Sequence, residues 1–167
     1  MKRLIRYWLP ALCALLLIFA DQFTKYLITS NLQLYESIPV IPDVFEIHYI
    51  RNSGTVWGIL SGMNMHTFFV LLTIVMVAVM IYAYVKLAAD RKFLPLNITI
   101  VILFAGAIGN MIDRIRYHYV VDFLYFKLIN FPVFNVADIY VVISIFLLAY
   151  LLLFHYKDED FAFGHTK

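Results

Sequence analysis

Charged residues are scarce in this sequence. Only 14% of its 167 residues are Asp, Glu, Lys or Arg, whereas 63% are hydrophobic. A soluble domain has about 25% charged residues, so this shortage favours a membrane protein. The net charge of +2 is also too small to suggest a nucleic-acid partner. The length is enough for one integral-membrane domain, and we expect that domain to cover residues 1–167.

Cysteine is almost absent as well. Cys13 is the only one, which excludes an internal disulfide and a cysteine metal cluster. We expect it to be a small packing residue in an apolar helix. The sequence also lacks a His-Glu-x-x-His zinc motif and a Gly-x-Ser-x-Gly nucleophile elbow. We therefore expect no metal and no cofactor.

Four segments approach the roughly 20 apolar residues needed to cross a bilayer. They are Trp8–Ile28, Thr67–Val85, Leu96–Ile112 and Val136–Phe154. Basic residues precede the first segment and follow the second, which predicts cytoplasmic termini and two longer loops outside. Arg114 and Arg116 fall on the outer side and count against this orientation.

The outer loops also show patterns. Apolar and polar residues alternate from Val44 to Arg51, which is typical of a strand with one wet face. This strand could belong to a small sheet lying at the membrane surface. The second outer loop, Arg114–Asn135, is rich in Tyr and Phe, which suit the lipid headgroup layer.

Polar residues gather at the outer ends of the predicted helices. Such clustering predicts one polar cavity that opens outward and lies partly within the lipid slab. The clusters are Asp21 with Lys25, Asn110 with Asp113 and Arg114, Asn135 with Asp138, and Arg51 to Gly54.

Simpler interpretations exist for several of these residues. Asp21 and Lys25 could form an ion pair in which Lys25 reaches to the interface. Asp113 could only mark a helix end, Asn135 could only cap the last helix, and Asp122 could be a solvated loop acid. Asp138 is harder to explain in this way, because it lies one turn inside an apolar helix.

Asp122 and Asp138 flank the start of the last apolar segment. Two carboxylates brought close together cannot both ionise easily, so one pKa rises and the pair shares a proton. The ionised member can then deprotonate a water while the neutral member protonates a peptide carbonyl. This chemistry needs neither a metal nor a covalent nucleophile.

Taken together, the clusters resemble the signature of the bacterial lipoprotein signal peptidases, also called signal peptidase II. Five motifs occur in order around the four segments, and the likeness covers nearly the whole chain. They are Asp21-Gln22-Phe23-Thr24-Lys25, Arg51-Asn52-Ser53-Gly54 with Trp57-Gly58, Gly109-Asn110-Met111-Ile112-Asp113-Arg114, Val120-Val121-Asp122-Phe123 and Phe134-Asn135-Val136-Ala137-Asp138.

The resemblance implies a membrane aspartic endopeptidase that removes the signal peptide from diacylglyceryl-modified prolipoproteins, just before the lipidated cysteine. It implies a fold of four transmembrane helices, an outer cradle of strands and a short interfacial segment before the last helix. The enzyme would lie in the bacterial cytoplasmic membrane with its active site toward the outer face. It would contact membrane lipid, and nothing requires more than a monomer.

The resemblance also implies roles for particular residues. Asp122 and Asp138 correspond to the catalytic pair. Residues expected to bind substrate or support the site are Asn52, Gly54, Asn110, Arg114 and Asn135. Residues expected to make structural polar contacts are Asp21, Lys25 and Asp113.

Two other functions would also explain polar residues beside lipid. A small proton-coupled transporter would use them as a proton relay, but the inner halves of the predicted helices have almost none. A non-catalytic scaffold would use them only to join helices.

Overall fold

The computed structural model describes residues 2–54 and 65–161. Trp57 and Gly58, which belong to one of the motifs above, lie outside the described residues. The long helices are α1 (Lys2–Asn31), α2 (Met65–Leu87), α3 (Leu94–Tyr117) and α4 (Val136–Tyr150), and the strands are β1 (Ser37–Ile41), β2 (Phe45–Asn52) and β3 (Val120–Tyr125). Short helical turns are η1 (Arg91–Phe93), η2 (Lys127–Ile129), η3 (Leu151–His155) and η4 (Asp158–Phe161).

The four predicted apolar segments all form helices. In the described part of the chain, four helical stretches are long and apolar enough to cross a membrane: Arg6–Asn31, Met65–Leu87, Arg91–Tyr117 and Val136–His155. Large apolar side chains face outward on them, such as Leu15 on α1, Val79 on α2 and Phe146 on α4. Lipid, unlike water, accepts such surfaces at little cost.

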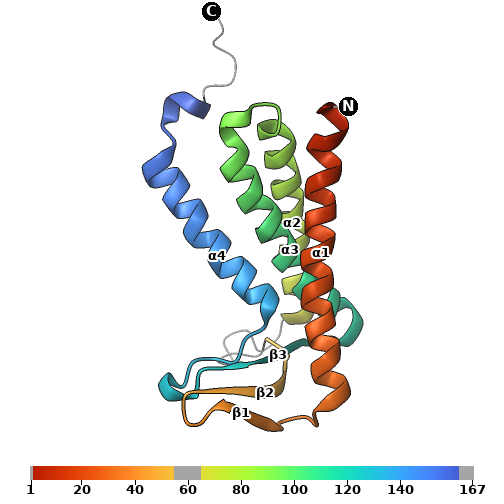
Figure 1. The fold of residues 1–167 in the computed structure, drawn as a ribbon. Coiled ribbons are helices and arrows are strands. Elements are labelled where there is room, and N and C mark those ends of the chain that lie inside the picture. Colours follow the sequence, from red (N-terminus) through yellow and green to blue (C-terminus); the bar gives the residue numbers. More distant parts are fainter. Residues whose placement is uncertain (1, 55–64, 162–167) are drawn as a thin grey trace, which may run out of the picture.

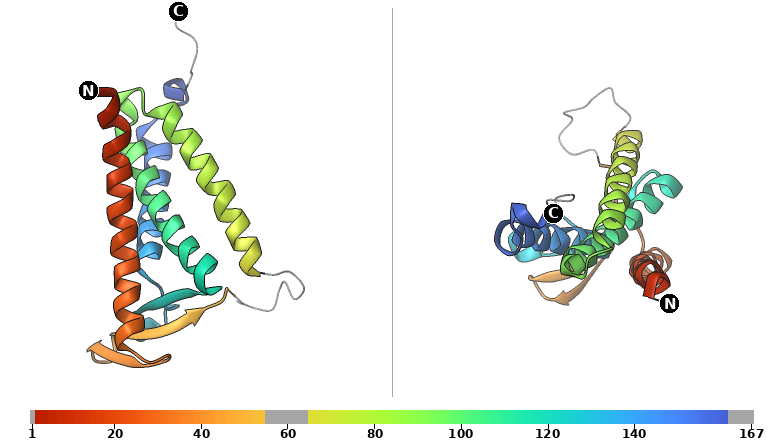
Figure 2. Two further views of the ribbon diagram at one scale, coloured as in Figure 1. Left: turned by 90° about the vertical axis from the view of Figure 1, so that its right-hand side faces the viewer. Right: turned by 90° about the horizontal axis from the view of Figure 1, so that it is seen from above.

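Helix α3 is the centre of the bundle, since it packs against α1, α2 and α4. Figure 2 shows α2 leaning away from α1 toward the end of the bundle where the sheet lies. The contact between α3 and α4 depends on glycine. A Cβ atom on Gly106 would lie 2.6 Å from the backbone oxygen of Ala137, so a larger residue there would push α4 away.

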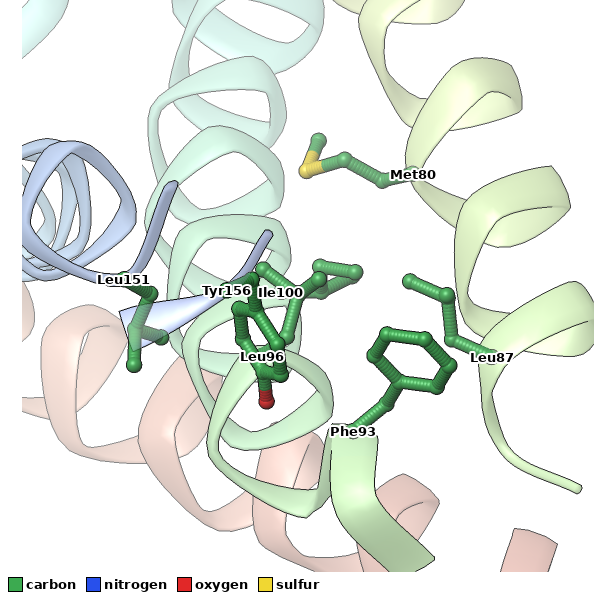
Figure 3. Close-up of a cluster of buried hydrophobic side chains, with 7 residues drawn as sticks. All are labelled: Met80, Leu87, Phe93, Leu96, Ile100, Leu151 and Tyr156. Carbon is green, nitrogen blue, oxygen red and sulfur yellow. The ribbon is translucent and has the colours of Figure 1, made fainter. Parts of the chain in front are cut away.

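A hydrophobic cluster fills the bundle near the end opposite the sheet (Figure 3). Phe93 is fully buried there, and its ring lies 5.4 Å from the rings of both Tyr156 and Phe161. The cluster thus anchors the segment that follows α4. Its members are Met80, Leu87, Phe93, Leu96, Ile100, Leu151 and Tyr156.

The three strands form one antiparallel sheet in the order β1-β2-β3. It lies across one end of the helices, away from the start of α1 and the end of α4 (Figure 1). The predicted strand at Val44–Arg51 corresponds to β2, whereas β3 forms within a segment expected only to be an aromatic loop. The predicted fold is confirmed: four membrane-compatible helices, a small sheet beside them and a short segment, η2, before the last helix.

Candidate active site

Asp122 lies on β3, on the side of the sheet that meets the helices. It pairs across the sheet with Ile50 of β2, and its side chain is only 1% exposed. Its Oδ2 atom accepts a hydrogen bond from Asn52 Nδ2 at 2.8 Å, and Oδ1 accepts one from Asn135 Nδ2 at 2.6 Å. The interpretation of Asp122 as a solvated loop acid is therefore wrong.

Asp138 lies in the first turn of α4, where Asn135 is the N-cap. The two residues form a reciprocal capping box. Asn135 Oδ1 accepts the Asp138 backbone N–H at 3.0 Å, and Asp138 Oδ2 accepts the Asn135 backbone N–H at 3.1 Å. Asn135 is a cap, as one interpretation had it, but it also joins the two acids because it donates to Asp122.

Backbone hydrogen bonds tie the residues just before α4 to the sheet. Phe134 pairs with Leu124 as an isolated bridge, with hydrogen bonds in both directions. These hydrogen bonds bring the end of the segment between β3 and α4 back against β3, directly before Asn135. Two acids 16 residues apart in the sequence therefore lie on either side of one asparagine.

Asn110 on α3 completes the ring of amides around the acids. Its Nδ2 atom donates to Asp138 Oδ1 at 2.7 Å, and its Oδ1 atom accepts from Asn135 Nδ2 at 3.1 Å. Each of the four carboxyl oxygens thus has one neutral donor. Because an oxygen has a second lone pair, each can still accept from a water or share a proton.

The surroundings of Asp122 favour its protonated form. Burial raises the pKa of Asp122 to about 6, and the negative charge of Asp138 acts in the same direction. Hydrogen bonds from Asn52 and Asn135 and the positive charge of Lys25 oppose this rise. A pair that keeps a proton near neutral pH can act as acid and base together.

Gly54 and Arg114 border the acids on the side of α2. Gly54 has a φ of +76° and donates its backbone N–H to Asn52 Oδ1 at 2.9 Å, which orients the Asn52 amide toward Asp122. Arg114 donates to the backbone oxygen of Asn110, and its guanidinium lies 5.1 Å from the centre of the Phe69 ring. A Cβ atom on Gly54 would lie 2.7 Å from the same ring.

Asp21, Lys25 and Asp113 form a buried ion cluster beside the acids. Lys25 Nζ lies 2.9 Å from Asp21 Oδ2 and 3.0 Å from Asp113 Oδ2, and its side chain is only 3% exposed. The interpretation that Lys25 reaches to the interface is therefore wrong. Asp113 does not merely mark the end of a helix either, because α3 continues to Tyr117.

Two neighbours of the site, Gln22 and Phe69, were given no role from the sequence, although Gln22 belongs to one of the quoted motifs. Gln22 donates to Asp113 Oδ1 at 3.0 Å and to the Gly109 backbone oxygen at 3.1 Å. Its position three residues before Lys25 was a usable signal, since such residues share a helix face. Phe69 had no such signal, because it is one of 15 phenylalanines in a largely apolar chain.

The structure brings all ten predicted site residues to the junction of the sheet with α1, α3 and α4. Within residues 2–54 and 65–161, no group of three or more His, Cys, Asp or Glu side chains is arranged to hold a metal ion. The fold and the site together define an integral membrane protein in which a buried carboxyl group, Asp122, and a half-buried one, Asp138, are joined by the asparagine between them.

Comparison with known proteins gives the family. The family described as signal peptidase (SPase) II matches residues 13–154. A lipoprotein signal peptidase of Caldanaerobacter subterraneus is 44% identical over 138 residues, which is 82% of this chain and 90% of that protein. One of Staphylococcus aureus is 40% identical over 144 residues, 85% of this chain and 86% of that protein.

Solved structures agree. One described as a bacterial membrane enzyme superposes with a TM-score of 0.79 at 35% identity, covering 90% of this chain and 96% of that one. A second has a TM-score of 0.76 at 34% identity, covering 96% and 94%. The chain belongs to the signal peptidase II family, and it is a peptidase. Nothing in these comparisons supports a transporter.

Proposed function

We propose that this protein is an aspartic endopeptidase, with Asp122 and Asp138 as its catalytic pair, that removes signal peptides from diacylglyceryl-modified prolipoproteins. The observation that carries the proposal is the pair itself. Asn135 donates a hydrogen bond to each acid, one through its side chain and one through its backbone. Relatives that align with this chain over most of their own length bear the name lipoprotein signal peptidase.

The pair would work with one shared proton. The ionised acid takes a proton from a water, whose oxygen then adds to the carbonyl carbon of the scissile peptide. The protonated acid gives its proton to the carbonyl oxygen. When the resulting gem-diol collapses, the carbon–nitrogen bond breaks, the leaving nitrogen takes a proton from one acid, and a hydroxyl group of the intermediate returns a proton to the other, which restores the shared proton. The raised pKa of Asp122, about 6, supports a proton held near neutral pH.

Residues around the pair would hold it and the substrate. Asn52, Asn110 and Asn135 fix the directions of the two carboxyl groups through the hydrogen bonds described above. Arg114 is a cation beside the pair, suited to bind a peptide carbonyl oxygen. Gly54 gives the turn that orients Asn52.

We infer the membrane position from the charge pattern and the shape. The basic residues near the start of α1 and around the α2–α3 turn lie at the end of the bundle away from the sheet (Figure 1). We propose that this end is cytoplasmic and that the acids face the outer side of a bacterial cytoplasmic membrane. A cysteine with two acyl chains would keep the scissile bond at that interface. We further propose one domain over residues 1–167, in contact with lipid and active as a monomer.

The test is cleavage of a synthetic diacylated prolipoprotein by the purified protein in detergent. We expect the wild type to cleave before the lipidated cysteine, equally well with and without a chelator. Asp122→Asn and Asp138→Asn should abolish cleavage while thermal unfolding shows a folded protein. The matched control is Asp43→Asn, which makes the same change at an exposed acid near the sheet and should leave the rate unchanged.

Each result is decisive for a different part of the proposal. Normal turnover by either folded dyad variant would refute the assignment of the catalytic pair. Loss of wild-type activity in chelator would refute the metal-free mechanism. A wild type that cleaves the peptide equally well without its acyl chains would refute the proposed substrate class.

A further inference from the structure

The ion cluster of Asp21, Lys25 and Asp113 touches the polypeptide just before each proposed catalytic acid. Asp21 Oδ1 accepts the backbone N–H of Ala137 at 2.9 Å, and Ala137 precedes Asp138. Asp113 Oδ2 accepts the backbone N–H of Val121 at 3.1 Å, and Val121 precedes Asp122. Each of these two carboxylates therefore holds the backbone of the residue that directly precedes one of the proposed catalytic acids.

Lys25 links these two carboxylates to each other. Its ammonium group lies 2.9 Å from Asp21 and 3.0 Å from Asp113. The side chains of Asp21 and Asp113 are 0% and 1% exposed, so water does not replace Lys25 as their partner. Because Asp21 is on α1 and Asp113 on α3, the ammonium group fixes the distance between the two backbone anchor points.

Lys25 also controls the amide of Asn110. The ammonium group donates to Asn110 Oδ1 at 3.0 Å. Since an ammonium group has donors only, the oxygen of the amide must face it. The Nδ2 group is then turned toward Asp138 Oδ1, to which it donates at 2.7 Å.

Stability alone is a weak explanation for such a cluster. Burying ionised groups costs solvation free energy, and replacing a buried ion pair with apolar residues is often neutral or stabilising. The cluster also has a specific direction: its acceptors point at the two residues that precede the acids. The cluster residues lie on α1 and α3, and Figure 1 shows these helices meeting β3 and the start of α4 at the same end of the bundle.

We infer that Asp21, Lys25 and Asp113 are positioning residues, which set the spacing and hydrogen-bond geometry of Asp122 and Asp138 without touching the substrate. The inference rests on the proposed function. A displacement of about 1 Å at a reacting group can cost a hundredfold in rate. Loss of the cluster should therefore lower kcat much more than it changes KM.

The first experiment removes the charge of Lys25. We expect Lys25→Met to lower kcat by about tenfold or more, within the range for small displacements, with KM nearly unchanged. Lys25→Arg keeps a cation and should recover part of the rate. Charged groups on three elements act on Asp122: Lys25 on α1, Arg114 on α3 and Asp138 on α4. Because Lys25 lowers the pKa of Asp122, its loss should move the acid limb of the kcat profile to higher pH.

The second experiment separates the backbone hydrogen bond from the charge. Asp21→Asn combined with Lys25→Met removes both charges but keeps an oxygen that can accept from Ala137. Asp21→Ala combined with Lys25→Met removes that oxygen as well. We expect the asparagine pair to be faster, per folded molecule, than the alanine pair. This charge-neutral comparison also serves if Lys25→Met alone does not fold.

Phe93→Ala is the control for stability. Phe93 is buried in the cluster at the opposite end of the bundle, so its loss should lower Tm without changing kcat or the pH profile. The inference is overturned if folded Lys25→Met keeps the wild-type kcat and pH profile, or if the two double variants are equally fast. In those cases Asp122→Asn would still be inactive and the proposed function would stand. Failure of the wild type to cleave would instead remove the proposed function and, with it, this inference.

Discussion

Asp122→Asn is expected to stabilise the protein at neutral pH, although the same change is expected to abolish cleavage. In the native state this carboxyl group is buried, which disfavours its ionised form and raises its pKa to about 6. An unfolded chain has the ordinary carboxyl pKa of about 4. Between these values the native state binds more protons than the unfolded state, so the free energy of unfolding falls as pH rises from about 4 to about 6. Above about pH 6 the folded protein carries the full free-energy cost of ionising the buried Asp122 carboxyl group.

The size of the effect can be worked out from the contacts. The difference between the two pKa values corresponds to about 3 kcal/mol of lost stability at pH 7 and above. Asparagine removes this penalty but has only one acceptor oxygen, whereas Asp122 accepts from both Asn52 and Asn135. One donor loses its partner, at a cost of about 1 kcal/mol for a partly exposed group. The net gain is therefore about 2 kcal/mol at pH 7.5.

The measurement is thermal unfolding of wild type and Asp122→Asn in one detergent, followed by circular dichroism from pH 4 to pH 8. Near pH 4, where the wild-type carboxyl group is itself protonated, only the lost hydrogen bond remains, so the variant should unfold at a slightly lower temperature than the wild type; above pH 7 it should unfold at a higher temperature. Asp43→Asn, at an exposed acid, should show no such divergence. A Tm difference that stays constant across the pH range would refute the reasoning.

Three further outcomes follow from single contacts. Gly109→Ala would place a Cβ atom 2.6 Å from Asp21 Oδ2, so it should cost about 1–3 kcal/mol, seen as a lower Tm, and an unchanged Tm would contradict the packing described. Asn52→Ala removes a hydrogen bond that lowers the pKa of Asp122, so the acid limb of the pH–rate profile should move to higher pH; a shift to lower pH would be inconsistent with this contact. Phe93→Ala removes a fully buried ring and should cost about 3–5 kcal/mol, measured by Tm, with kcat per folded molecule retained.

The sequence was most informative where chemistry conflicts with environment. Asp138 attracted notice because a carboxylate one turn inside an apolar helix is costly, and the ordered motifs then indicated the family. The four helices could be predicted because their apolar runs are long and the loops between them are polar or aromatic. Strand β2 could be predicted because its two faces differ in polarity.

Tertiary partners explain what could not be predicted. Strand β3 is short and gains its hydrogen bonds from β2, about 70 residues earlier in the chain, so its own residues gave little periodic signal. The spacing of Asp21 and Lys25 predicted only a pair on one helix. Their third member, Asp113, comes from α3, and no local pattern predicts that Lys25 turns inward to meet it.

The placement of the proposed acids on β3 and α4 has a consequence for biosynthesis. Asp122 follows the third membrane-compatible helix and Asp138 opens the fourth. A ribosome therefore completes three helices before either acid is made, and the ring of asparagines cannot close until the last helix has entered the membrane. An unfinished chain has no competent pair, so the hydrolytic activity proposed here would begin only when insertion is complete.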